Sequence, residues 1–534
     1  MLPITAAAIG IGALAAVVAF ALLRLIGLFT NLFYFQRFSS DFVSPSKSSL
    51  GLWMVLVPVV GGALVGVMAR YGSERIRGHG IPEALEAILT RGSRVEPRVA
   101  LLKPLSSAIS IGSGGPFGAE GPIIMTGGAL GSMLAQFFHL TAAERKTLLV
   151  AGAAAGMSAT FSAPIASVLL AVELLLFELK PRSFVPVALA SATAMVVRTF
   201  LLGKGPLFTL PHHAVALGPV GLAGCVVLGV LVGVLAWLMT LSVYASEDLF
   251  KKLPVHWMWW PALGAVFVGL GGLVEPRALG VGYDSIESLL RGDLPQGDVL
   301  RLVLVKWGIW AAYLGSGTSG GVLAPLLMIG GALGGLAERI LPAEGAGMWP
   351  LLAMGGILGG TMRSPLTGIV FAVELTGESG AFLPLLVTAT VAHAFTVLVM
   401  RRSILTEKVA RRGFHVTREY AIDPLDVLFV RDVMDFEVPA GAPVPVTAYP
   451  DETMRDVVQR MANTGHTELA VVERDDPSRL LGVVTLAHTL KAKQRHLEEE
   501  TRRERLLTVR SLIPRAFRPR RFSTEPVSQP ANSA

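Results

Sequence analysis

The sequence predicts an all-α polytopic membrane protein that is followed by a small α/β domain. The chain has 534 residues, of which 52% are hydrophobic and only 16% are charged, whereas about 25% is typical of soluble domains. The charge is uneven, since the last 134 residues hold 41 of the charged side chains. Long apolar runs fill the first 400 residues, and a helix that spans a bilayer needs about 20 such residues.

The apolar runs define the membrane domain in chain order. Their number and length argue against a large soluble core. The first run lacks a basic n-region and a cleavage site, so we expect a retained membrane helix rather than a signal peptide. The single cysteine, Cys225, excludes a disulfide scaffold. The runs span residues 4–34, 51–69, 147–177, 184–201, 216–243, 258–274, 348–376 and 381–400.

Two segments recur at nearly one offset, which predicts a duplicated domain. Residues 122–131 (PIIMTGGALG) resemble a segment 203 positions later, and residues 163–174 resemble one 201 positions later. We expect two repeats, roughly 1–200 and 201–415, with the functional centre between them. The sequence alone leaves open whether the repeat is inverted or parallel.

Three glycine- and proline-rich elements each lead into a helix-like run: GHGIP (78–82), GAEGP (118–122) and GGVLAP (320–325). A helix N-terminus offers unsatisfied N–H groups and a partial positive charge, which suit an anion. Several such ends that meet inside the membrane would bind an anion without a fixed cationic side chain. The alternative is that these glycines serve only close helix packing.

Glu120 favours the anion site. An ionised carboxylate inside a membrane costs roughly 2.5–3.5 kcal/mol, and no lysine or arginine follows it until Arg145. We expect backbone N–H groups to bind it, so that it competes with an anion. Protonation would release it, which would make Glu120 a gate, a proton carrier or both. The alternative is a structural carboxylate that caps a helix.

These motifs, in this order, resemble the CLC family of voltage-gated chloride channels and Cl⁻/H⁺ antiporters over about residues 5 to 415. The resemblance implies a CLC-type inverted repeat of tilted, broken helices and a homodimer with one pathway in each subunit. It makes Glu120 the gating glutamate. The anion-facing residues that it implies are His79, Gly80, Ile81, Gly121, Pro122, Ile123, Val322, Leu323 and Leu405.

Two of these positions depart from the family pattern. His79 stands where the family has serine; it would add an N–H donor that can carry charge near neutral pH, or it points away from the anion. The family's selectivity for chloride over other anions therefore does not carry over securely. Leu405 stands where the family has a tyrosine, so the inner constriction would be apolar or open.

A third departure concerns proton coupling. Leu174 occupies the position of a second, internal glutamate that is typical of the family's antiporters. Glu178 lies four residues later, and on a helix it would share a face with Leu174. It is a candidate replacement as proton acceptor; the alternative is an interfacial glutamate beside Lys180 and Arg182.

The polar remainder resembles a CBS module over residues 416–500. Only one repeat is evident, whereas these modules usually work as pairs, so the partner could come from another subunit. His488 stands where many nucleotide-binding repeats have aspartate, which argues against nucleotide binding, and no other cofactor is expected. Residues 501–534 carry eight arginines and two glutamates, and we expect a disordered basic tail.

The sequence therefore predicts chloride transport that is gated by Glu120 and is channel-like or weakly proton-coupled. A fully coupled Cl⁻/H⁺ antiporter is the alternative within the family. No motif supports an intramembrane enzyme, and the incomplete CBS repeat argues against a receptor. The expected partners are chloride, protons and the lipid bilayer, with no nucleic acid. We expect a multi-pass protein of the cell membrane with a cytoplasmic C-terminal module.

Overall fold

A computed structural model shows two compact units, Met1–Thr417 and Arg418–Ala534. The predicted basic tail, 501–534, lies outside the described residues. The structure describes residues 2–138, 140–208, 218–342, 345, 347–412, 425, 428–436, 446–474, 476, 478–491 and 494.

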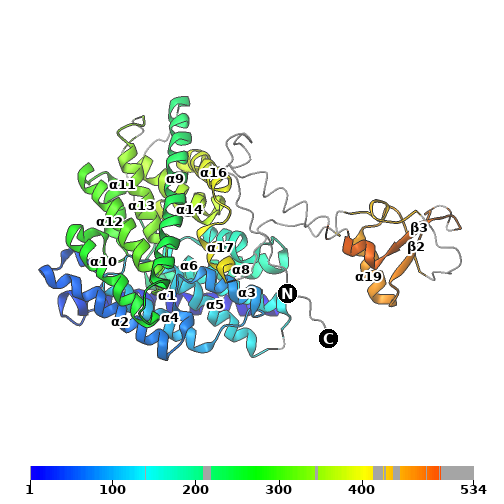
Figure 1. Cartoon of the computed structure of the whole chain (residues 1–534), viewed down its shortest axis with the longest axis horizontal. Coiled ribbons are helices and arrows are strands. Elements are labelled where there is room, and N and C mark those ends of the chain that lie inside the picture. Colours follow the sequence, from blue (N-terminus) through cyan, green and yellow to red (C-terminus); the bar gives the residue numbers. More distant parts are fainter. Residues whose placement is uncertain are drawn as a thin grey trace, which may run out of the picture. The chain divides into compact units, whose positions relative to one another are not determined.

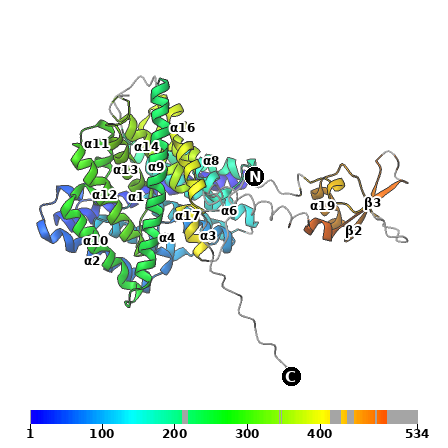
Figure 2. The same ribbon diagram turned by 45° about the horizontal axis from the view of Figure 1, so that its top comes forward.

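The first unit is built of helices alone within the described residues. The first repeat comprises α1 (Leu2–Phe35), α2 (Leu56–Tyr71), α3 (Ile81–Thr90), α4 (Pro97–Gly112), α5 (Glu120–Gln136), α6 (Ala142–Phe161), α7 (Pro164–Leu170) and α8 (Pro181–Leu201). The second comprises α9 (Pro219–Lys251), α10 (Trp260–Val274), α11 (Tyr283–Arg291), α12 (Gln296–Gly315), α13 (Leu323–Ala337), α14 (Met348–Met362), α15 (Pro365–Thr376), α16 (Phe382–Val399) and α17 (Ile404–Arg411). Figures 1 and 2 show the two sets as adjacent groups, blue to cyan and green to yellow.

The helices differ in length and burial. Among the described residues, six helical segments are long and apolar enough to cross a membrane. Several others are shorter, and every residue of α14 is buried. A helix that is apolar on all sides belongs inside the protein, so α14 lies in the interior of the domain.

Reciprocal contacts relate the two repeats by an approximate two-fold axis. The carboxylate of Glu173, in the first repeat, accepts a hydrogen bond of 2.9 Å from the backbone N–H of Thr367 at the start of α15. Glu374, in the second repeat, accepts one of 2.8 Å from the N–H of Ala166 at the start of α7. Each repeat thus caps a helix of the other, which the N-terminal partial charge favours.

The second unit holds a small sheet in the order β1 (Thr447–Ala448), β2 (Glu468–Val472) and β3 (Leu480–Thr485). β1 and β2 are parallel, and β2 and β3 are antiparallel. Helix α19 (Met454–Thr464) buries Met454, Val457 and Met461 in the core of this unit. The predicted fold class, an all-α membrane domain with a small α/β domain, is confirmed.

Candidate anion site

The three glycine- and proline-rich elements meet at the centre of the first unit. The N–H of Gly78 donates to the carbonyl of Thr318 at 2.8 Å. Gly118 and Gly321 exchange two backbone hydrogen bonds of 3.2 and 2.9 Å. Each element leads directly into a helix, α3, α5 or α13. Three helix N-termini therefore lie around one small region.

This meeting of backbones depends on glycine. A Cβ atom on Gly121 would overlap the carbonyl of His79, and one on Gly80 would overlap the carbonyl of Gly121. Gly80 also has a φ angle of 93°, which residues with a Cβ atom rarely adopt. The approach of α3 to α5 therefore leaves no room for side chains at these two positions.

The side chain of Glu120 lies between α5 and α13. Its side chain is fully buried, and Oε1 accepts a 3.0 Å hydrogen bond from the N–H of Ala324. Oε2 has no hydrogen-bond partner among the described residues. A Cβ atom on Gly118 would overlap Oε2, and one on Gly321 would lie 2.7 Å from the carboxyl carbon. The paired glycines leave the space that the carboxylate fills.

The backbone donors differ in part from those that the resemblance implies. Ala324, which binds the carboxylate, was not among the predicted site residues. The N–H of Ile123 donates to a carbonyl one turn earlier in the chain, and Pro122 has no N–H group. The N–H of Gly80 donates to Oε2 of Glu83 at 2.7 Å. These N–H groups are therefore engaged or absent in this conformation.

The other predicted residues lie at the ends of the same helices. Val322 and Leu323 form the start of α13 and are fully buried, and Ile81 is the first residue of α3. His79 is 3% exposed, and its Nδ1 has no hydrogen-bond partner among the described residues. The imidazole thus keeps an unused polar atom beside the site.

Leu405 is buried in the first turn of α17. Its neighbour Ile404 accepts a hydrogen bond at its carbonyl from the hydroxyl of Tyr244 on α9. A tyrosine therefore lies beside this position, although its hydroxyl is already engaged. Leu405 itself contributes only an aliphatic side chain.

The helical premise for Glu178 is wrong. The helix that contains Leu174 ends at Leu176, and Phe177 adopts a left-handed conformation with a φ angle of 53°. Leu174 and Glu178 therefore share no helical face. Glu178 instead forms an ion pair with Lys180 at 3.5 Å, as in the interfacial alternative.

Two buried lysines support the site, and the sequence analysis missed both. Nζ of Lys103 donates to the carbonyls of Ile76 and Gly78 at 2.8 and 2.6 Å. Lys306, 203 positions later, lies within electrostatic range of Glu120. Both lysines are fully buried. Each repeat therefore has a buried lysine at a matching position, and lysines at the repeat offset were the available signal in the sequence.

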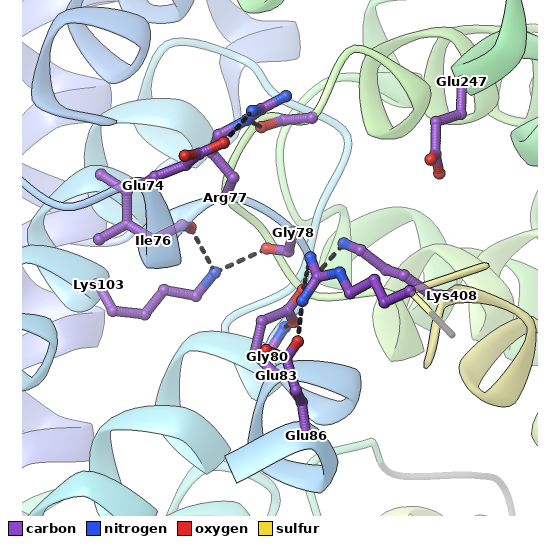
Figure 3. A network of polar contacts seen from close by, with 12 residues as sticks. Glu74, Ile76, Arg77, Gly78, Gly80, Glu83, Glu86, Lys103, Glu247 and Lys408 are labelled. Carbon is purple, nitrogen blue, oxygen red and sulfur yellow. Dashed lines mark hydrogen bonds and ion pairs between the residues drawn. The ribbon is translucent and has the colours of Figure 1, made fainter. Parts of the chain in front are cut away.

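A cavity of about 660 Å³ reaches the first of these elements from a charged rim. Its wall includes Gly78, Glu83 and Lys408, together with side chains of both charges from α9 and the C-terminal end of α17. Figure 3 shows Lys103 on one side of Gly78 and Glu83 and Lys408 on the other. The cavity gives a polar approach to the meeting point of the helices.

Comparison with known proteins identifies the family. Residues 61–397 match the family described as voltage gated chloride channel. The chain belongs to this family. The H(+)/Cl(-) exchange transporters ClcA of Vibrio cholerae and Salmonella arizonae are similar to this CLC protein. They are 30% and 31% identical to it over 62% and 61% of its chain, which is 74% and 72% of theirs.

Solved structures show the same fold. A slow cyanobacterial Cl⁻/H⁺ antiporter aligns with a TM-score of 0.69 and 22% identity, covering 77% of this chain and 97% of that one. A CLC-type fluoride/proton antiporter aligns with a TM-score of 0.61 and 20% identity, covering 73% and 94%. Residues 430–495 match the CBS domain family, so the CLC domain is followed by one CBS repeat.

Proposed function

We propose that the protein transports chloride across the membrane through this site, with Glu120 as the gate. The proposal rests on the position of the Glu120 carboxylate. An anion and the carboxylate would both seek the N–H groups at the start of α13, and two negative charges exclude each other there. Protonation removes the charge of Glu120 and weakens its hold on Ala324. The carboxyl can then leave and an anion can pass.

The remaining residues have supporting roles in this proposal. Val322 and Leu323 would present backbone N–H groups to the anion at the start of α13, and His79 would add the donor of its imidazole. Leu405 would line an apolar inner constriction. The charged cavity beside Gly78 would collect anions from one side of the membrane.

The decisive experiment is chloride efflux from proteoliposomes as a function of pH. Wild-type flux should rise as the pH falls, whereas Glu120→Gln should conduct at every pH, about tenfold faster than wild type at neutral pH. Glu144→Gln is the matched control, since Glu144 lies away from the site in the first turn of α6, where it accepts the backbone N–H of Thr141. A Glu120→Gln protein that keeps the full pH dependence would contradict the gate.

We further propose that the transport is channel-like or weakly coupled to protons. Leu174 cannot accept a proton, and Glu178 is paired with Lys180 beyond the end of its helix. Full Cl⁻/H⁺ exchange is the second candidate, which the names of the ClcA relatives favour. Reversal potentials in crossed chloride and proton gradients separate the two. A reversal potential that follows the chloride gradient alone supports the channel-like reading, and one that follows both gradients supports exchange.

The assembly and the C-terminal module complete the proposal. We expect a homodimer in the membrane, a cytoplasmic CBS repeat and no bound nucleotide. In that repeat, the backbone N–H of His488 donates to the hydroxyl of Thr485 at 3.3 Å. Nδ1 of His488 accepts the backbone N–H of Thr485 at 3.4 Å, so the imidazole is engaged at the position where many nucleotide-binding repeats have an aspartate for the ribose. Light scattering in detergent tests the dimer, and calorimetry with adenosine nucleotides tests the module.

A further inference from the structure

Glu83 holds the backbone that precedes α3. One oxygen, Oε2, accepts the N–H of Gly80 at 2.7 Å. The other, Oε1, lies 2.9 Å from Nζ of Lys408 on α17. The side chains are 6% and 19% exposed. Glu83 is therefore a buried bridge between a backbone amide of the site and a cation from a distant helix.

The same pair packs directly on Gly78. A Cβ atom at Gly78 would overlap both Oε1 of Glu83 and Nζ of Lys408. On the opposite side, Nζ of Lys103 donates to the Gly78 carbonyl at 2.6 Å. The segment 78–80, which carries His79, is thus held by side chains from three helices, α3, α4 and α17 (Figure 3).

A second ion pair ties α17 to α3. Arg412, one turn beyond Lys408, pairs with Glu86, one turn beyond Glu83. Its guanidinium also lies 4.0 Å from Oε1 of Glu83. The two helices are therefore joined at two successive turns, and the orientation of α17 sets where Lys408 meets Glu83.

We propose that Glu83 and Lys408 are a positioning pair that fixes segment 78–80 and thereby sets the affinity of the site for its anion. This inference rests on the proposed transport of chloride through the site. Buried ion pairs add little net stability, because desolvation offsets their attraction, but they can specify one geometry. Here the pair engages the N–H of Gly80 and holds the backbone on either side of His79. The anion would then meet His79 in one fixed position.

Other charges face the pair, and a test must separate geometry from charge. Lys103 interacts with the pair from α4 and Arg412 from α17, and His79 interacts with it from the segment before α3. A pure charge effect predicts opposite results, because loss of Lys408 adds net negative charge and loss of Glu83 removes it. A positioning effect predicts that both losses weaken anion binding, because either one frees the segment.

The experiment measures initial chloride efflux from proteoliposomes against chloride concentration, at one pH. Lys408→Met and Glu83→Gln should each raise the half-saturating concentration about tenfold, equivalent to about 1.4 kcal/mol. The double variant should raise the half-saturating concentration no more than the single variant with the larger shift does, because both changes break the same contact. Lys408→Arg should stay within about twofold of wild type. Arg411→Met is the control, since Arg411 pairs with Asp248 and Glu407 rather than with α3.

Three results would overturn the positioning pair: shifts of opposite sign in the two single variants, additive shifts in the double variant, or half-saturation equal to wild type. Glu83→Gln keeps the size of the side chain and an acceptor for Gly80, so it serves even where Lys408→Met does not fold. If the wild type and Glu120→Gln both carry no chloride, the transport proposal itself fails. If both carry chloride and the Glu83 and Lys408 variants match wild type, only the positioning pair fails.

Discussion

The two repeats build the same frame but differ in the residue that lies at its centre. Gly118 and Gly321 are equivalent by the 203-residue offset, and they pair with each other across the approximate two-fold axis. Two positions further on, the first repeat has Glu120 and the second has Leu323. The carboxylate of one repeat therefore reaches the helix N-terminus of the other, and no carboxylate returns. The frame is symmetric, whereas the carboxylate at its centre belongs to one repeat only.

The loops before α3 and α11 show the same contrast between a shared frame and an unshared carboxylate. Lys103 holds the first loop, and Lys306 holds the second through the carbonyls of Ala278 and Gly280 at 2.9 and 2.8 Å. Glu83, in the first turn of α3, also holds the first loop and forms an ion pair, whereas the equivalent residue, Ser285, donates to a backbone carbonyl at 3.3 Å. The buried lysines are therefore common to both repeats, whereas the carboxylates of Glu120 and Glu83 occur in the first repeat only.

The largest expected effect tests the buried lysines that the two repeats share. Lys103→Met and Lys306→Met should each destabilise the protein by about 2–5 kcal/mol, because each removes the amino group that donates to two buried carbonyls. The midpoints of thermal unfolding in detergent should fall by similar amounts. Only Lys103→Met should also raise the half-saturating chloride concentration through segment 78–80. Equal stability of Lys306→Met and wild type would show that the second loop needs no support.

The next largest effect tests the space at Gly118 and Gly321 that the Glu120 carboxylate fills. In Gly321→Ala, the new methyl group would lie 2.6 Å from the carbonyl oxygen of Gly118 and 2.7 Å from the carboxyl carbon of Glu120, so the glycine pair must separate and the carboxylate must move. Chloride efflux at neutral pH should rise about tenfold, which corresponds to about 1.4 kcal/mol, and should lose its pH dependence. Gly308→Ala is the control, because nothing lies within 4 Å of its added methyl group. Unchanged gating in Gly321→Ala would mean that the glycine pair does not hold the gate closed.

Local patterns in the sequence predicted much of this site. Glycine and proline before an apolar run mark a helix start, and all three marked elements do meet. A carboxylate among glycines pointed to a backbone donor, and Glu120 has one in Ala324. The particular donor was missed, since it lies 204 residues away in the chain and its choice depends on how α5 and α13 pack.

The rest depended on tertiary structure that spacing does not report. The role of Glu83 requires Lys408, which only the packing of α17 on α3 brings near. The premise for Glu178 failed because a left-handed residue at Phe177 ends the helix, and residue spacing carries no sign of it. Lys103 and Lys306 could have been found from the sequence, because two lysines at the repeat offset inside apolar runs are an unusual coincidence.

The smallest expected effect tests whether the two repeats are also equivalent at their reciprocal helix caps. Glu173→Gln and Glu374→Gln each remove a charged cap from a helix of the other repeat, which should cost about 1 kcal/mol. Glu173 also accepts the hydroxyl of Thr367 at 2.5 Å, so its loss should cost slightly more. Thermal unfolding measures both, and chloride flux should stay unchanged. If one variant costs nothing, the reciprocal caps are not equivalent, and the two repeats differ in their frame as well as in the carboxylate at its centre.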